Sequence, residues 1–133
     1  MEWNIPSNEL NGNITNQNAA AAIFDSENAD IITLQETSSG ADEIATILAT
    51  NYVLAVAIDG QEIWVKSGER FQIDSTGSWA GLCNNRSLNG ATVSLRALNS
   101  NDSRLYIYSA HFCIPDTFAG NVDINPSVSN EDQ

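Results

Sequence analysis

This sequence has few basic residues and only one histidine, two cysteines and three prolines. Five Lys and Arg residues stand against seventeen Asp and Glu residues, which gives a formal net charge of −12. A surface of that charge repels nucleic acid at long range, so the charge gives no evidence for a nucleic-acid partner. A metal ion and a few arginines can still reverse the potential locally, so the charge does not exclude a nuclease.

Long apolar runs are also missing. None approaches the roughly 20 residues that cross a bilayer, so we expect no membrane span. No basic segment followed by an apolar one occurs near Met1, so no signal peptide is visible and the localisation stays unknown. What is present, 133 residues of which 42% are apolar, suits one folded domain.

The N-terminal part predicts a short strand and then a helix. Met1–Ile5 has the pattern of a strand that ends at Pro6. The run TNQNAAAAIFDSEN begins at Thr15 and is rich in alanine, so it predicts a helix with Thr15 or Asn16 as its N-cap. One face of that helix would carry Ala20, Ile23 and Phe24.

A buried strand and a second helix follow. Ile31–Leu34 is a continuous apolar, β-branched run, which is typical of a strand buried on both faces. After Glu36, Ser38 or Ser39 can cap a helix whose apolar stripe would consist of Ile44, Ile47 and Leu48.

Beyond Asn51 the pattern predicts antiparallel strands. Tyr52–Ile58 and Glu62–Lys66 flank an Asp-Gly turn and predict a hairpin. A further strand is predicted over Phe71–Trp79, and a second hairpin over Ala91–Leu98 and Arg104–Phe112.

This order of elements predicts an α/β (α+β) fold. Its mixed sheet would carry two helices on one face, and a second sheet is needed to cover the other face. We expect one domain over residues 1–113. Residues 114–133 form an acidic segment rich in Asn, Pro and Ser, which predicts a loosely ordered tail.

Three polar residues at strand ends are the candidates for chemistry, because catalytic groups often occupy the rim of a rigid sheet. Asn4, Glu36 and His111 each end or closely follow an apolar run, so one sheet edge could bring them together. Glu36 offers the carboxylate oxygen that Mg²⁺ prefers, His111 could donate a proton, and Asn4 could orient metal-bound water or a phosphate. Each also has an ordinary structural explanation, such as a solvated strand end or a hydrogen-bonded core histidine.

The motifs around these residues resemble those of a known family. WNI at Trp3–Ile5, ADIITLQE at Ala29–Glu36 and SAHF at Ser109–Phe112 are similar in sequence and order to motifs of the endonuclease/exonuclease/phosphatase superfamily. ADIITLQE is the most specific of the three. The resemblance extends to about residue 113 and corresponds to the N-terminal half of a member, which implies a partial β-sandwich of that type.

The resemblance also implies roles for individual residues. Glu36 matches the glutamate that binds the divalent cation, Mg²⁺ or Mn²⁺. Asn4 matches the asparagine that positions metal and phosphate, and His111 matches the histidine beside the scissile phosphate. Arg86 resembles more loosely an arginine near the phosphate, although an ordinary surface arginine fits as well. The implied substrate is a phosphodiester, in nucleic acid or in a phospholipid or inositol phosphate.

Two motifs of the superfamily are missing from these 133 residues. One is Gly-Asp-x-Asn, and the other is the Ser-Asp-His whose histidine acts as general base. FAGNVDIN at Phe118–Asn125 superficially resembles the first, but it follows His111 too closely. We therefore expect a partial phosphodiesterase or nuclease, poorly active unless a second polypeptide completes it. The alternatives are a non-catalytic binding module that keeps the half-fold, and an unrelated acidic α/β protein.

The two cysteines are a disulfide candidate. The second predicted hairpin folds the region of Cys83 back towards Cys113, and a bond requires Cα atoms within about 7 Å. A pair of buried thiols is the alternative, because the sequence does not show whether the protein works in an oxidising compartment.

Overall fold

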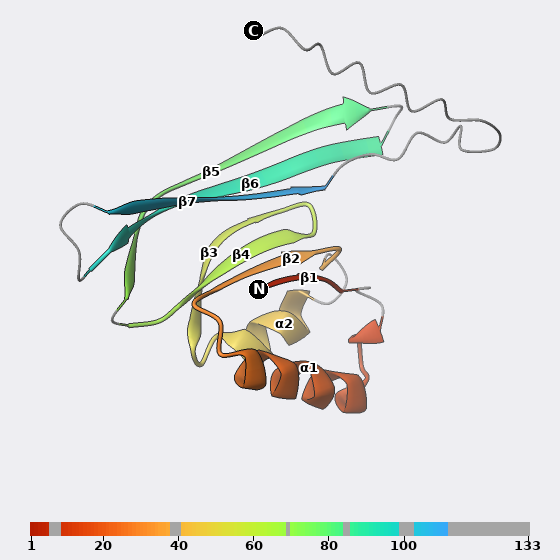
Figure 1. Ribbon diagram of the computed structural model, residues 1–133. Helices are drawn as coiled ribbons and strands as arrows, with labels where there is room; N and C mark the ends of the chain where they lie inside the picture. The colour runs from red at the N-terminus through yellow and green to blue at the C-terminus, as the bar shows by residue number, and fades with distance from the viewer. Residues whose placement is uncertain (6–8, 38–40, 69, 84–85, 99–102, 112–133) are drawn as a thin grey trace, which may run out of the picture.

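The computed structural model describes residues 1–5, 9–37, 41–68, 70–83, 86–98 and 103–111. These residues form three layers, namely a pair of helices, a four-stranded sheet and a three-stranded sheet (Figure 1). The elements are β1 (Glu2–Asn4), α1 (Ile14–Glu27), β2 (Ile31–Gln35), α2 (Ala41–Leu48), β3 (Tyr52–Ile58), β4 (Gln61–Lys66), β5 (Phe71–Cys83), β6 (Arg86–Ala97) and β7 (Arg104–His111). The predicted fold class, a mixed α/β sandwich with its helices on one face, is confirmed.

The first sheet has the strand order β1-β2-β4-β3. β1 pairs with β2 in parallel, with Asn4 opposite Gln35, and α1 makes the crossover that a parallel pair requires. The other neighbours are antiparallel. β3 and β4 join at Asp59 and Gly60, whose φ angles of 41° and 78° match the hairpin turn that Asp-Gly favours.

The second sheet, of order β5-β6-β7, covers the face of the first sheet opposite the helices (Figure 1). Two apolar clusters hold the layers together. On the helix side, Ile32, Leu34 and Trp64 pack with Phe24 and Ile44, among others. Between the sheets the buried cluster consists of Ile63, Val65, Ala91, Val93 and Leu95.

A buried hydrogen bond across the sandwich fixes the relative direction of the strands. Ser109 Oγ, near the end of β7, donates to Gln61 Oε1 at the start of β4, at 3.2 Å. β4 runs antiparallel to β2, so its start lies beside the carboxyl end of β2. β7 therefore ends at the same end of the sandwich as β1 and β2.

Several local predictions need correction. The N-cap of α1 is Asn13, not Thr15 or Asn16, because the Asn13 side chain accepts the Asn16 N–H and Ile14 is already helical. Ile23, predicted on the buried face of α1, is 40% exposed. β5 and β6 continue further towards their shared turn than the predicted strands did, because backbone pairing holds residues with little strand preference.

Some predictions fall on residues outside the described part of the structure, namely the capping role of Ser38 or Ser39, the position of Cys113 and the tail over 114–133. Neither described helix is long and apolar enough to cross a membrane.

Candidate functional site

The candidate site begins with a direct contact between Asn4 and Glu36. Asn4 is the last residue of β1, and Glu36 directly follows β2. Because the two strands are parallel neighbours, their carboxyl ends meet, and Asn4 Nδ2 donates to Glu36 Oε1 at 3.1 Å. Both residues are exposed, so a ligand can reach the carboxylate and the amide.

Glu36 has an unusual backbone conformation. Its φ angle is +62°, in the left-handed region that non-glycine residues rarely adopt. Such a conformation costs on the order of 1 kcal/mol or more, and it persists only where neighbouring contacts hold it. Backbone strain of this kind gathers at functional sites, so the φ angle independently draws attention to Glu36.

The residue after Glu36 supplies the contacts that hold it. The Thr37 N–H donates to the Gly60 carbonyl at 2.9 Å, and Thr37 Oγ1 donates to Glu62 Oε1 at 3.0 Å. Glu62 Oε2 in turn accepts the Trp64 Nε1–H at 2.6 Å. The chain after β2 is therefore tied to the turn and first residues of β4.

The motifs of the sequence do not predict these supporting residues. Gln61, Glu62, Thr37 and Ser109 are buried polar side chains. The available signal was the pair Gln61-Glu62 directly after the Asp-Gly turn, in a strand that otherwise reads Ile-Trp-Val. A sequence cannot show that this pair is buried, because its partners Thr37 and Ser109 are distant along the chain.

His111 and Arg86 lie on the second sheet, not on the sheet that carries Asn4 and Glu36. This corrects the expectation that one sheet edge would hold all three candidates, since two sheets meet at this end instead. His111 is the last residue of β7 and pairs with Asn89 in register. Arg86 begins β6 opposite Cys83, beyond Asn89 towards the same end. The side chains of His111 and Arg86 lie outside the described part of the structure, and their roles stay predictions.

Metal ligands are few in the described ranges. No group of three or more His, Cys, Asp or Glu side chains there is arranged to hold a metal ion. Mg²⁺ commonly uses one or two protein carboxylates and keeps several waters. Glu36 beside the Asn4 amide offers one carboxylate that could hold a largely hydrated Mg²⁺ or Mn²⁺ ion.

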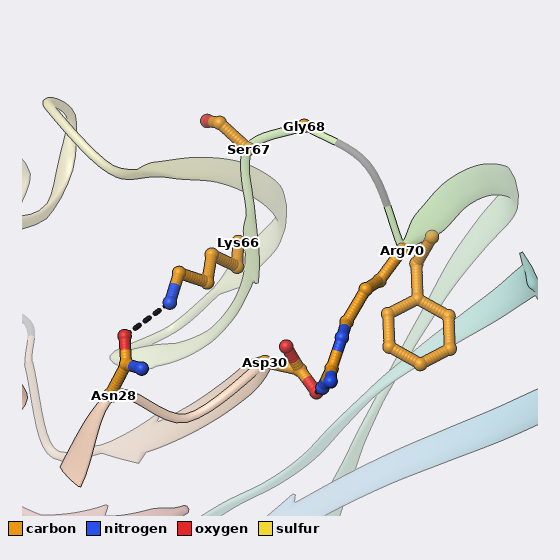
Figure 2. A pocket seen from close by; sticks show the side chains of 7 residues that line it. Asn28, Asp30, Lys66, Ser67, Gly68 and Arg70 are labelled. Atoms are coloured by element: carbon orange, nitrogen blue, oxygen red, sulfur yellow. Dashed lines mark hydrogen bonds and ion pairs between the residues drawn. The ribbon is translucent and has the colours of Figure 1, made fainter. Parts of the chain in front are cut away.

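The opposite end of the sandwich holds the basic side chains Lys66, Arg70, Arg96 and Arg104. Arg96 Nη2 pairs with Asp74 Oδ1 at 2.6 Å, and Arg104 Nε lies 3.9 Å from Asp74 Oδ2. Lys66 and Arg70 line a cavity of about 500 Å³ together with Asn28 and Asp30. Figure 2 shows Lys66 hydrogen-bonded to Asn28, and Arg70 beside Asp30. Arg70 Nη1 lies 2.6 Å from Asp30 Oδ2.

Tyr52 lies at this opposite end as well. It pairs with Lys66 in register, and its hydroxyl donates to the Ala29 carbonyl at 2.9 Å. Burial raises the pKa of Tyr52, and the charges of Asp25 and Asp30 raise it further. This end therefore pairs three of its basic side chains with Asp30 and Asp74 and holds the buried Tyr52, whereas the Asn4–Glu36 end exposes a carboxylate.

The layers and the strand order define a mixed α/β sandwich, consistent in fold with part of an endonuclease/exonuclease/phosphatase-type sandwich. Solved structures of TDP2 match this chain. D. rerio TDP2 complexed with a single-strand DNA product gives a TM-score of 0.69 at 12% identity, over 89% of this chain and 47% of that one. A humanized D. rerio TDP2 with 14 mutations gives 0.63 at 14% identity, over 83% and 45%. TDP2 from C. elegans gives 0.62 at 16% identity, over 83% and 34%.

No family model and no curated protein matches the sequence. TDP2 is an enzyme of the endonuclease/exonuclease/phosphatase superfamily, so the resemblance seen in the motifs is confirmed at the level of the fold. At 12–16% identity the likeness shows the fold alone. The chain spans less than half the length of each of these TDP2 chains.

Proposed function

We propose that this chain is the metal-binding half of a divalent-metal-dependent phosphodiesterase or nuclease, and that it is poorly active by itself. The observation that carries the proposal is the Asn4–Glu36 hydrogen bond at the carboxyl ends of two parallel strands. Glu36 also has a strained φ angle, and the surrounding fold is that of TDP2.

Each residue has a role in this proposal. Glu36 holds the cation through its carboxylate, and Asn4 positions the carboxylate and the phosphate through its amide. His111 stands at the end of β7 as the proton donor, and Arg86 contributes positive charge towards the phosphate. The cation, when bound, would stabilise negative charge on the phosphoryl oxygens.

The substrate we propose is a nucleic acid. One of the TDP2 structures is a complex with a single-strand DNA product, which favours nucleic acid over a phospholipid or an inositol phosphate. The structural neighbour supports this substrate and the charge of this chain does not, because a net charge of −12 repels a polyanion.

Low activity follows from what the 133 residues do not contain. The general base and the second phosphate-binding motif of the superfamily are missing from the sequence. A general base contributes about 10²–10⁴ in rate, and oriented electrostatic groups contribute on a similar scale. These groups would have to come from outside this chain, for example from a second polypeptide.

The test measures Mn²⁺ binding by water-proton relaxation, and cleavage of single-stranded DNA and bis-p-nitrophenyl phosphate. We expect weak binding that Glu36→Gln lowers by more than about tenfold, with cleavage close to background. Glu27→Gln is the matched control, because it removes the same charge from the exposed last residue of α1, which lies at the end of the sandwich opposite Glu36. Equal Mn²⁺ binding by both variants would contradict the metal site. Robust turnover abolished by Glu36→Ala would contradict low activity.

The alternative is a non-catalytic binding module with the same half-fold, favoured by the missing general base. It predicts DNA binding that does not depend on Mn²⁺ or on Glu36. A filter-binding or anisotropy titration of wild type and Glu36→Gln, with and without Mn²⁺, separates the two proposals.

A further inference from the structure

The first two residues of β4, Gln61 and Glu62, are both polar and both buried. Gln61 is 1% exposed and Glu62 is 5% exposed. Being neighbours on a strand, they point to opposite faces of the sheet. Gln61 faces the second sheet, where it meets Ser109, and Glu62 faces the helices with Trp64. One short segment thus places a polar group in each core.

Glu62 supports the turn that carries Glu36. Its Oε1 accepts the Thr37 hydroxyl at 3.0 Å, while its Oε2 accepts the Trp64 indole N–H at 2.6 Å. Both carboxylate oxygens therefore have a donor, and Trp64 is itself buried in the helix-side core. Thr37 is held between Glu62 and the Gly60 carbonyl, so the backbone directly after Glu36 is anchored at two atoms.

Gln61 supports the strand that ends in His111. Its Oε1 accepts the Ser109 hydroxyl at 3.2 Å, between the two sheets. Ser109 lies two residues before His111, the last residue of β7. The bond therefore holds the end of β7 against the start of β4.

Stability alone does not account for these choices. Apolar residues of similar size, in place of a buried polar or charged group and its partners together, commonly stabilise a core as well or better. A buried carboxylate or amide costs free energy unless its hydrogen bonds are made. The next three residues of β4, Ile63, Trp64 and Val65, build the apolar cores. The polar pair stands only at the strand end beside Asn4 and Glu36.

We propose that Gln61 and Glu62 are positioning residues for the candidate site. Glu62 acts through Thr37 to fix Glu36 in its left-handed conformation, and Gln61 acts through Ser109 to fix the strand that ends at His111. The roles of Glu36 and His111 themselves rest on the proposed function, whereas the geometry that Gln61 and Glu62 impose does not.

The Glu62 arm is tested by nuclear magnetic resonance on the ¹⁵N-labelled, metal-free chain. The reporter is the Asn4 side-chain amide, which is assigned by its loss in Asn4→Ala. Thr37→Val removes the hydroxyl and keeps the size, so the amide signal should move by more than its linewidth, towards its position in Glu36→Ala. Thr37→Ser keeps the hydroxyl and should restore the wild-type position. Thr33→Val, the same change at another buried threonine, should leave the signal in place.

The Gln61 arm uses the ring signals of His111, which is the only histidine and needs no further assignment. Ser109→Ala should shift these signals by more than their linewidth. Ser94→Ala removes a hydroxyl from another buried serine of the same sheet and should not. An unchanged Asn4 amide in Thr37→Val, or unchanged His111 signals in Ser109→Ala, overturns that arm of the proposal. If Thr37→Val does not fold, Glu62→Gln takes its place, because it keeps the volume and can accept from only one of its two donors.

A last measurement joins the inference to the proposed function. Mn²⁺ affinity should fall about tenfold in Thr37→Val and stay unchanged in Thr37→Ser, as for other residues that orient a metal ligand. If Mn²⁺ binding does not depend on Glu36 at all, the proposed function fails. The metal-free spectra still decide whether Gln61 and Glu62 position the site.

Discussion

The packing of the two sheets against each other can be tested at Ile63. This side chain is 0% exposed and lies in the cluster between the sheets with Val65, Val93 and Leu95. Ile63→Ala removes three carbons, which at about 0.8 kcal/mol per buried methylene loses about 2.4 kcal/mol of transfer free energy. A cavity term adds to this, so we expect a loss of about 3–4 kcal/mol. A loss of this size is a large share of the unfolding free energy of a typical domain.

The assay is urea unfolding followed by tryptophan fluorescence. With an m-value of about 1.5 kcal/mol per molar, the midpoint of Ile63→Ala should fall by about 2 M at unchanged m. Ile14→Ala is the matched control, because Ile14 is 65% exposed and its truncation should change stability by less than about 0.5 kcal/mol. A loss below about 1 kcal/mol at Ile63 would show that the sheets do not pack together in the isolated chain.

Two further predictions concern other parts of the fold. The pKa of Tyr52 is raised by burial and by Asp25 and Asp30. The phenol of the unfolded chain begins to lose its proton near its ordinary pKa of about 10, whereas the folded chain still keeps it. The unfolding free energy should therefore fall as pH rises above about 10. In urea unfolding this fall should be smaller in Tyr52→Phe than in Tyr108→Phe, the same change at an exposed tyrosine. Equal falls of the unfolding free energy with pH in the two variants would contradict this. Gly60 has a φ of +78°, so Gly60→Ala should lose about 1–2 kcal/mol in the same assay, and an unchanged midpoint would rule out the proposed turn.

Elements specified by local chemistry were predictable from the sequence. Ile31–Leu34 is apolar on both faces, and it forms the central strand β2. The hairpin of β3 and β4 follows from two runs rich in β-branched and other apolar residues around Asp59 and Gly60. The contact between Asn4 and Glu36 also follows from the sequence, because polar residues ending two parallel strands lie at one sheet edge.

Features that depend on distant contacts were not predictable in the same way. Asn13, Thr15 and Asn16 can all cap a helix, and the approach of the preceding loop selects Asn13. That loop is held by Asn16 Nδ2 donating to the Glu9 carbonyl, and by Gln17 Nε2 donating to the Leu10 carbonyl. The burial of Gln61 and Glu62 likewise depends on partners 48 and 25 residues away, which no local pattern reveals.

The separation of charge along the sandwich has a kinetic consequence. Four of the five basic residues lie at the end opposite Glu36, so Arg86 is the one Lys or Arg towards the site end of a chain whose net charge is −12. A polyanion such as single-stranded DNA must approach that end against repulsion. Added salt shortens the Debye length from about 30 Å at 0.01 M to about 10 Å at 0.1 M and so weakens the repulsion. Association should therefore become faster with ionic strength, opposite to the behaviour of proteins that attract nucleic acid through a basic surface.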